Sequence, residues 1–168
     1  MSDLSRDEAH AALTDLLSDV RAGMLGLKGS DQHMQPMTHH HDPEASTLWF
    51  ITSRKTDLAR AVENGTVARF TATKGDQRAW ASMTGTIAHS ADTAKLDEIW
   101  SSVAAAWFDK GRDDPDICLL EMRLAEAAVW TATGNPLVFG LEIARANLNE
   151  ERKPDIGSHA VIGFSRAA

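Results

Sequence analysis

Three consecutive histidines, His39, His40 and His41, are the first residues of this sequence that could do chemistry. In a strand, His39 and His41 share one face with His33, whereas His40 points to the other side. A zinc site needs further ligands arranged around the metal, and the spacing of the remaining residues picks out none. We therefore predict no metal site. We expect these histidines at a strand end, where they face solvent or a ligand.

The single cysteine offers little nucleophilic chemistry. Cys118 lies in the apolar run Ile117–Leu120, where a thiol behaves as a small core residue. The sequence holds no Gly-x-Ser-x-Gly elbow, no P-loop and no dinucleotide-binding glycine fingerprint. The paired carboxylates Asp113 and Asp114 fall in a polar loop. If the protein catalyses a reaction, a cofactor is therefore expected to supply the reactive group.

The stretch Leu48–Leu58 is the best candidate for binding an anion. An apolar strand runs into the hydroxyls of Thr52 and Ser53, then into the cations Arg54-Lys55 and a predicted helix start at Thr56. Hydroxyls, free amides at a helix start and nearby positive charge together suit a phosphate group. Ordinary helix capping explains the same hydroxyl residues, and this alternative remains open.

Five tryptophans with no tyrosine make an unusual aromatic balance. Trp100 and Trp107 are seven residues apart on one predicted helix face, so we expect both to pack in the core. Trp49, Trp80 and Trp130 lie in strand-like runs, where each could serve as core, interface or a platform for a flat ring.

The first element that must position these residues is a helix over residues 5–22. Ser5 and Glu8 have the spacing of a capping box, and Gly23 is the expected terminator. The apolar residues that follow recur at helical spacing, which predicts one buried face. They are Ala9, Ala12, Leu13, Leu16, Leu17 and Val20.

A β-rich barrel is predicted from about residue 22 to residue 132. Turns at Gly29-Ser30-Asp31 and Gly75-Asp76 join neighbouring runs as hairpins, and a short helix ends before Asn64-Gly65. A second helix, capped by Asp92, is expected to reach Trp107. Strand-like runs follow at 117–124 and 127–132.

The C-terminal extension, residues 134–168, reads as a helix, a loop and a strand. These are expected at Leu137–Leu148, Asn149–Asp155 and His159–Phe164. Because tight hairpins join several strands, the fold class is mainly β with peripheral helices, a largely antiparallel small barrel. At 168 residues the chain has room for one domain.

Composition excludes several classes of function. The 17 basic and 24 acidic side chains give a net charge of −7, so we expect no nucleic-acid partner. No apolar run is long enough to span a bilayer, and residues 1–8 lack the pattern of a signal peptide. We expect a soluble, cytoplasmic protein with no membrane partner.

Several short motifs, taken in order, resemble a known family. They are Gln35-Pro36-Met37-Thr38, Leu48–Ser53, Thr56-Asp57-Leu58, Ala81–Gly85, Leu96–Trp100, Ala106-Trp107-Phe108, Asp113-Asp114-Pro115 and Ala128-Val129-Trp130. This set, within residues 8 to 132, is similar to the general stress protein branch of the pyridoxamine 5′-phosphate oxidase-like, FMN-binding split-barrel proteins.

The resemblance implies a six-stranded antiparallel split β-barrel that forms a homodimer, with FMN (or FAD) in clefts between the subunits. It implies that the strand around Met34–Thr38 lies beside the flavin, that Ile51–Leu58 holds the phosphate, and that Trp130 approaches from the partner subunit. The cofactor-binding residues it implies are Gln35, Pro36, Met37, Thr38, Phe50, Ile51, Thr52, Ser53, Thr56, Asp57, Leu58, Trp80, Ser82 and Trp130.

The sequence departs from the family pattern at two expected cations. Gln35 stands where many relatives have arginine, and Leu58 where many have lysine. Arg54, Lys55, Arg78 or a histidine are the candidates to replace them. The closing arginine-rich motif of true oxidases is also absent, so pyridoxamine phosphate oxidation is not expected. The leading hypothesis is a flavin-dependent oxidoreductase of unknown substrate, with NAD(P)H as a possible donor. The alternatives are a non-catalytic flavin carrier or sensor, a structural dimer without cofactor, and a haem protein.

Overall fold

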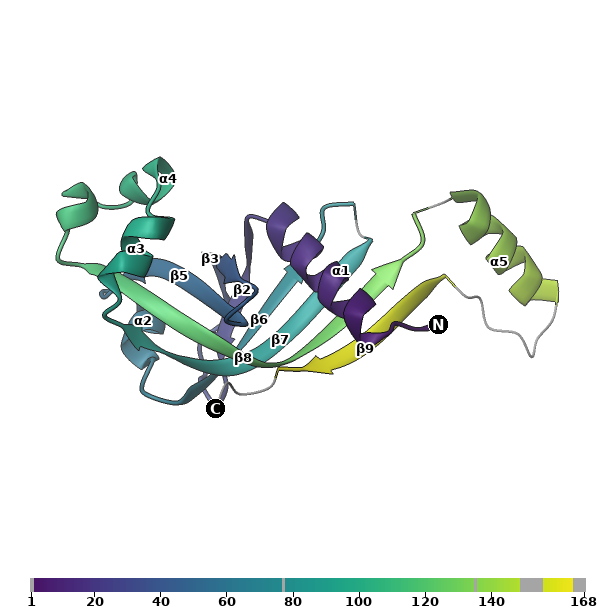
Figure 1. The fold of residues 1–168 in the computed structure, drawn as a ribbon, viewed down its shortest axis with the longest axis horizontal. Coiled ribbons are helices and arrows are strands. Elements are labelled where there is room, and N and C mark those ends of the chain that lie inside the picture. Colours follow the sequence, from purple (N-terminus) through teal and green to yellow (C-terminus); the bar gives the residue numbers. More distant parts are fainter. Residues whose placement is uncertain (1, 77, 135, 149–155, 165–168) are drawn as a thin grey trace.

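A computed structural model describes residues 2–76, 78–134, 136–148 and 156–164. The fold is mainly β, with helices at its periphery, as predicted (Figure 1). The strands are β1 (Ser2–Asp3), β2 (Ala22–Leu27), β3 (Gln35–Thr38), β4 (His40–Asp42), β5 (Thr47–Ser53), β6 (Thr66–Thr73), β7 (Ala79–Ser90), β8 (Ile117–Ala132) and β9 (Gly157–Gly163). The helices are α1 (Arg6–Asp19), α2 (Asp57–Ala61), α3 (Thr93–Ile99), α4 (Ser102–Ala105), a 3₁₀ turn at Gly111–Asp113, and α5 (Pro136–Leu148).

The strands form one curved sheet that is consistent with a split barrel. Its main path runs β1-β9-β8-β7-β6-β2-β3, while β5 pairs with the first half of β8 and β3 contacts β5. The predicted antiparallel split barrel is supported, but the predicted count of six strands is too low, because β9 also contributes Ile162 to the core. Within the described residues the sheet has nine strands, because β4 extends the edge at β5 and β1 and β9 extend the far end of β8. All pairings are antiparallel except β1 with β9.

Helix α1 covers one face of this sheet, where it lies across β7, β8 and β9 (Figure 1). The predicted capping box is present, since the Ser5 hydroxyl accepts from the Glu8 amide and the Glu8 carboxylate accepts from the Ser5 amide. The predicted apolar stripe is buried at Ala9, Leu13, Leu16 and Leu17. The local sequence therefore predicted both the start of the helix and the face it buries.

The predicted end of α1 is wrong. The helix stops at Asp19, where the extended Val20 donates its amide to Leu16. Gly23 lies inside β2, and a Cβ there would collide with the ring of Phe70 and the carbonyl of Thr71. This glycine therefore serves close packing in the sheet rather than helix termination.

Both predicted hairpins are confirmed. Strand β2 pairs with β3 across a turn in which Gly29 has φ of +80°, and β6 pairs with β7. The short helix α2 begins where expected, with Thr56 as its N-cap.

The strand-like runs at 117–124 and 127–132 form one strand of 16 residues, β8. The gap between the two predicted runs is a β-bulge. Leu124 pairs with Gly85 and Glu126 pairs with Thr84, so Ala125 between them has no partner in β7. A Cβ at Gly85 would overlap the backbone of Arg123, so glycine is required at this bulge.

The long helix predicted from Asp92 to Trp107 is also wrong. Helix α3 ends at Ile99, because Trp100 is extended. The Ser101 hydroxyl then caps a separate helix, α4, by accepting from the Ala104 amide. Trp100 packs near Phe108 against a second apolar cluster, but Trp107 is 82% exposed. The predicted helix is interrupted here because Ser101, a residue suited to capping, starts a new helix directly after the extended Trp100.

The helix and the strand predicted in the C-terminal extension are present as α5 and β9. The loop expected over Asn149–Asp155 lies outside the described residues. No helix among the described residues is long and apolar enough to cross a membrane.

Candidate functional site

The predicted phosphate segment lies where β5 passes into α2. Ser53 accepts the Lys55 amide at 3.2 Å, and the Thr56 hydroxyl accepts the Ala59 amide at 3.1 Å. The Thr56 hydroxyl also donates to the carbonyl of Ser53 at 2.9 Å. Capping thus occupies Ser53 and Thr56, and Thr52 is the hydroxyl of this segment for which the structure records no side-chain hydrogen bond. Of the predicted residues, the structure gathers Thr52, Ser53, Thr56 and Asp57 here, and we call them the anchor group.

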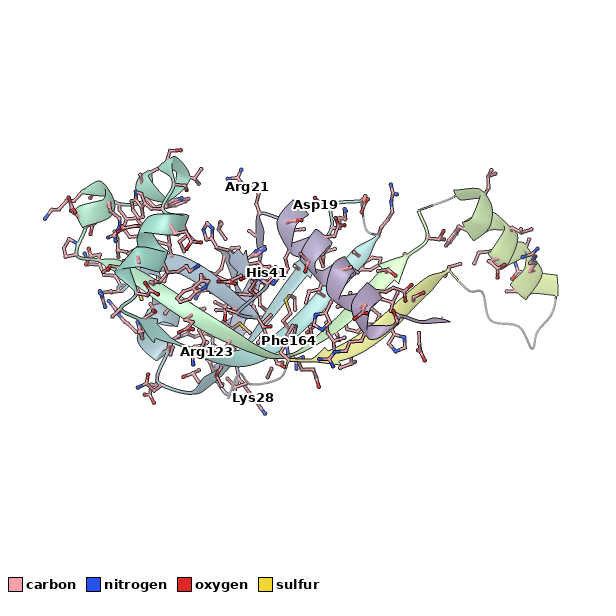
Figure 2. The ribbon with its side chains drawn as sticks, in the orientation of Figure 1. Asp19, Arg21, Lys28, His41, Arg123 and Phe164 are labelled. Carbon is pink, nitrogen blue, oxygen red and sulfur yellow. The ribbon has the colours of Figure 1, made fainter. Side chains whose placement is uncertain are left out.

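Arg54 is the unengaged cation beside the anchor group. Lys55 pairs with Asp116, which raises the pKa of the Lys55 ammonium above its usual value. Arg78 pairs with Asp76 at 3.1 Å. Within the described part of the chain the exposed Arg54 guanidinium forms no ion pair, so it is available to an anion. Two further exposed cations, Arg21 and Lys28, project outward from the two ends of β2 (Figure 2).

Strand β3 connects this region to the edge of the sheet. It contacts β5, and the loop before it is tied to α2 because the Gln32 amide nitrogen donates to the carbonyl of Asp57 at 3.3 Å. Pro36 and Thr38 are exposed, whereas Gln35 and Met37 are half-buried with Met37 packed against the core. Half of the predicted β3 residues thus face outward.

Three predicted residues lie on the sheet face opposite α1. Trp80 and Ser82 have the same parity along β7, and Trp130 is the direct partner of Trp80 on β8. The two tryptophans line an apolar hollow of about 470 Å³ that also includes Ala132 and Ile156. This volume falls in the range of ~300–1,000 Å³ that is usual for small-molecule sites. We call Trp80, Ser82 and Trp130 the ring group.

The anchor group and the ring group lie at opposite ends of β8. Thr52 is paired with Cys118, and Trp130 lies twelve positions further along the same strand. At about 3.3 Å per residue this is roughly 40 Å along the strand. Figure 1 shows β5 and α2 at one end of β8 and the connection to α5 at the other. A flavin mononucleotide is shorter than this path along the strand, so the two groups of one chain are well separated along β8.

Two predicted cofactor-binding residues have their side chains in the core. Phe50 is fully buried and its ring packs 5.4 Å from that of Phe70, and Leu58 is buried in the same cluster. Ile51 packs against the second cluster with Trp49, which is buried. Phe50 and Leu58 can therefore offer a ligand their backbone groups only, whereas Ile51 is half-buried.

The prediction that the histidine triplet faces solvent or a ligand is wrong for His39, which is buried, whereas His40 and His41 are half-buried. His39 is buried against Phe70, and its Nε2 lies 2.9 Å from the carbonyl of Leu17, to which it donates. Its Nδ1 has no partner among the described residues. Burial lowers the pKa of His39, His40 and His41 below the usual value for histidine. In the described part of the chain no three His, Cys, Asp or Glu side chains gather as metal ligands do.

Sequence reasoning missed His89, which joins α2 to strand β8 of the barrel. Its Nε2 lies 2.9 Å from the carbonyl of Ala59 in α2, and its Nδ1 lies 3.1 Å from the Cys118 sulfur. Since a carbonyl can only accept, Nε2 carries the proton and Nδ1 accepts from the thiol in the neutral ring. Burial raises the pKa of Cys118, which keeps the thiol protonated and able to donate. No local pattern could have revealed a bond between residues so far apart in the sequence.

Comparison with known proteins gives matches in families and in solved structures. The family model for pyridoxamine 5′-phosphate oxidase-like proteins matches residues 8–155. No curated protein matches the chain significantly. A crystal structure named as a general stress protein 26 from Jannaschia sp. CCS1 is similar, with 40% identity and a TM-score of 0.76, over 92% of this chain and 99% of that one.

Two further structures come from Xanthomonas. One, named as a general stress family protein from Xanthomonas campestris pv. campestris, has 29% identity and a TM-score of 0.68 over 80% of this chain and 93% of that one. The other is the general stress FMN/FAD binding protein from Xanthomonas citri, with 28% identity and a TM-score of 0.69. It matches over 78% of this chain and 93% of that one.

Proposed function

Because the chain belongs to the pyridoxamine 5′-phosphate oxidase-like family, in its general stress protein branch, we propose that it binds a flavin nucleotide in a cleft between two copies of itself. FMN is the proposed cofactor, with FAD as the alternative. One copy supplies the anchor group for the phosphate, and the other supplies the ring group beside the isoalloxazine.

The observation that carries this proposal is the separation of the two groups along β8. Twelve residues of extended strand divide the partner of Thr52 from Trp130. We therefore assign the two groups that bind one flavin to different chains. A symmetric dimer then places two such sites at equivalent positions, because each surface patch meets the complementary patch of the other copy.

The described residues fit a flavin. The hollow beside Trp80 and Trp130 is apolar and open, which suits a flat ring. Thr52 and the unpaired Arg54 suit a phosphate, since charge-assisted hydrogen bonds to anions are the stronger ones. A bound flavin would supply the capacity to accept electrons or hydride, whereas the protein would hold the ring, orient it and limit access of water.

Complementation between subunits tests this arrangement. Arg54→Glu removes the cation beside the anchor group and Trp130→Ala removes a ring of the ring group, so each variant alone should bind FMN poorly in fluorescence-quenching titrations. Mixing the two variants with subunit exchange should restore about a quarter of the sites, because half of the dimers are mixed and each has one intact site. Trp107→Ala, which changes an exposed tryptophan on another element, is the control and should bind like wild type. Normal FMN binding by both single variants, or no recovery after exchange, would contradict the proposal.

Redox catalysis is the leading activity within this proposal, and a flavin carrier or sensor is the second candidate. The second candidate is favoured by the small number of cations, since Gln35 and Leu58 are uncharged and Lys55 is already paired. Anaerobic mixing of the flavin-loaded protein with NADH or NADPH separates the two. Loss of the flavin absorption indicates an oxidoreductase, and an unchanged spectrum with tight binding indicates a carrier or sensor.

A further inference from the structure

Helix α2 is too short to keep its position without contacts to the rest of the chain. It has five residues, Asp57–Ala61, and a helix of this length does not persist in water by itself. Its side chains at Leu58 and Ala59 are buried in the core, but the last carbonyls of any helix lack intrahelical donors. The position of α2 matters because the anchor group lies at its start.

His89 supplies a donor for one of these carbonyls. Its Nε2–H donates to the carbonyl of Ala59 at 2.9 Å, whereas the Val62 amide lies 3.4 Å from the same oxygen. Its Nδ1 accepts from the Cys118 thiol at 3.1 Å. Burial raises the pKa of Cys118, and Arg54 is near enough for its positive charge to oppose that increase. The thiol therefore remains a donor, and the bridge lies near the cation that is available to an anion.

The contacts of His89 continue into the anchor group. The Ala59 amide donates to the Thr56 hydroxyl at 3.1 Å, and that hydroxyl donates to the carbonyl of Ser53 at 2.9 Å. Ala59 is thus held at both of its backbone groups, by His89 at the carbonyl and by Thr56 at the amide. From the Cys118 thiol to the Ser53 carbonyl, each donor meets an acceptor, so the neutral imidazole fits this series of bonds without an unpaired group.

This series of bonds ends beside the point at which it starts. Thr52, the residue before Ser53, is the register partner of Cys118 across β5 and β8. Directly paired residues of antiparallel strands have their Cβ atoms about 4.5–5.5 Å apart, on the same face of the sheet. The contacts therefore form a closed ring around the anchor group, and His89 is the contribution of β7 to that ring.

We propose that His89 is a positioning residue for the phosphate of the flavin nucleotide. It acts through the Ala59 carbonyl, because by tying α2 to β8 it keeps Thr52 and Arg54 at the spacing that a phosphate requires. The inference rests on the proposed function, since it takes the bound anion to be the flavin phosphate. His89 itself is exposed, so its replacement removes the bridge without leaving a cavity in the core.

Two substitutions at His89 separate positioning from simple packing. His89→Leu should weaken FMN binding about three- to tenfold, the range that corresponds to one net hydrogen bond. His89→Gln, whose amide nitrogen can still donate to the Ala59 carbonyl, should bind FMN within about twofold of wild type. The control is His10→Leu, the same change on α1, which should leave the affinity unaltered. Fluorescence-quenching titration on the full chain measures all four proteins, and circular dichroism checks that they are folded.

Hydrogen–deuterium exchange of the flavin-free proteins gives a second measurement that does not depend on the ligand. Peptides that cover α2 should exchange at least about threefold faster in His89→Leu than in wild type, because one hydrogen bond that holds the helix is lost. The same peptides should exchange at the wild-type rate in His89→Gln and in His10→Leu.

Three outcomes would each overturn the inference. They are unchanged exchange of α2 in His89→Leu, an equal loss of FMN affinity in His89→Gln and His89→Leu, and faster exchange of α2 with unchanged FMN affinity. A wild-type protein that binds no FMN would overturn the proposed function and the phosphate role of His89 with it, while the exchange rates would still show whether His89 holds α2.

Discussion

Two adjacent rows of residues cross the same strands and meet opposite environments. The first row consists of successive register partners from β2 to β9, all of them buried beneath α1 or in the barrel. They are Leu25, Phe70, Met83, Ala127 and Ile162. A second row lies one position away along each strand, on the sheet face opposite α1, which we call the open face. It consists of Met24, Thr71, Ser82, Ala128 and Val161. Met24 is 40% exposed and Val161 59%.

The buried row stabilises the folded chain, whereas the row on the open face is suited to binding. The buried row contains apolar residues only, as expected where side chains must fill a core without voids. The open-face row mixes hydroxyls, a small residue and exposed apolar groups, and the ring group lies within and beside it. Such a surface adds little to folding of a single chain, and its composition suits a ligand or a second protein surface.

The largest expected effect is on the free energy of unfolding, when the same methionine-to-alanine change is made once on each face of the sheet. Met83→Ala should lower the free energy of unfolding by about 2–5 kcal/mol, because the side chain is fully buried and its loss leaves a cavity. Met24→Ala, the matched change on the open face, should cost under about 1 kcal/mol in the monomer. Urea unfolding of both variants at low protein concentration measures the contrast. Equal losses would mean that the open face also belongs to the core of the single chain.

A smaller effect is expected for flavin binding at the open face. Trp130→Ala should weaken FMN binding by about 1–2 kcal/mol, or roughly 5–30-fold, because an aromatic wall of the hollow is lost. The stability of the flavin-free chain should fall less than in Met83→Ala, since Trp130 is only half-buried. Isothermal titration calorimetry and urea unfolding on the same preparation give both values. A variant that loses stability without losing affinity would assign Trp130 to the core.

The smallest effect is a pH dependence on the buried side. Because burial lowers the pKa of His39, the unfolded chain binds more protons at this residue than the folded protein below about pH 6.5. The free energy of unfolding should therefore be highest above this pH and decrease as the pH falls toward 5. His39→Leu, which cannot titrate, should show a shallower decrease between pH 7 and pH 5 in thermal unfolding. His40 and His41 also have lowered pKa values, so the slope should shrink without disappearing. An identical slope in the variant would exclude His39 as a contributor.

Local signals in the sequence predicted most of the elements. The Ser5–Glu8 capping box, the glycine-containing turns and the Thr56 cap involve residues within a few positions of each other, so their chemistry can be identified from spacing alone. The resemblance to the family was carried by short ordered motifs and is confirmed by the family match.

The incorrect predictions fall where a local signal had two interpretations. Gly23 suits either a helix terminator or a crowded strand, and only the position of Phe70 against β2 decides between them. Trp100 and Trp107 continue the same helical spacing, but Ser101 begins a new helix and leaves Trp107 exposed. The bulge at Gly85 could not be foreseen, because it depends on the pairing partner in β8.

The sequence by itself determined where α1 and α2 begin, where two hairpins turn and that the fold is mainly β, because hydrogen-bonded caps and turns act between neighbours in the chain. Only the tertiary structure decided which face α1 covers, which face stays open, and that the anchor and ring groups lie at opposite ends of β8. These outcomes depend on pairing between strands that are distant in sequence, and residue spacing along the chain does not show which distant strands pair.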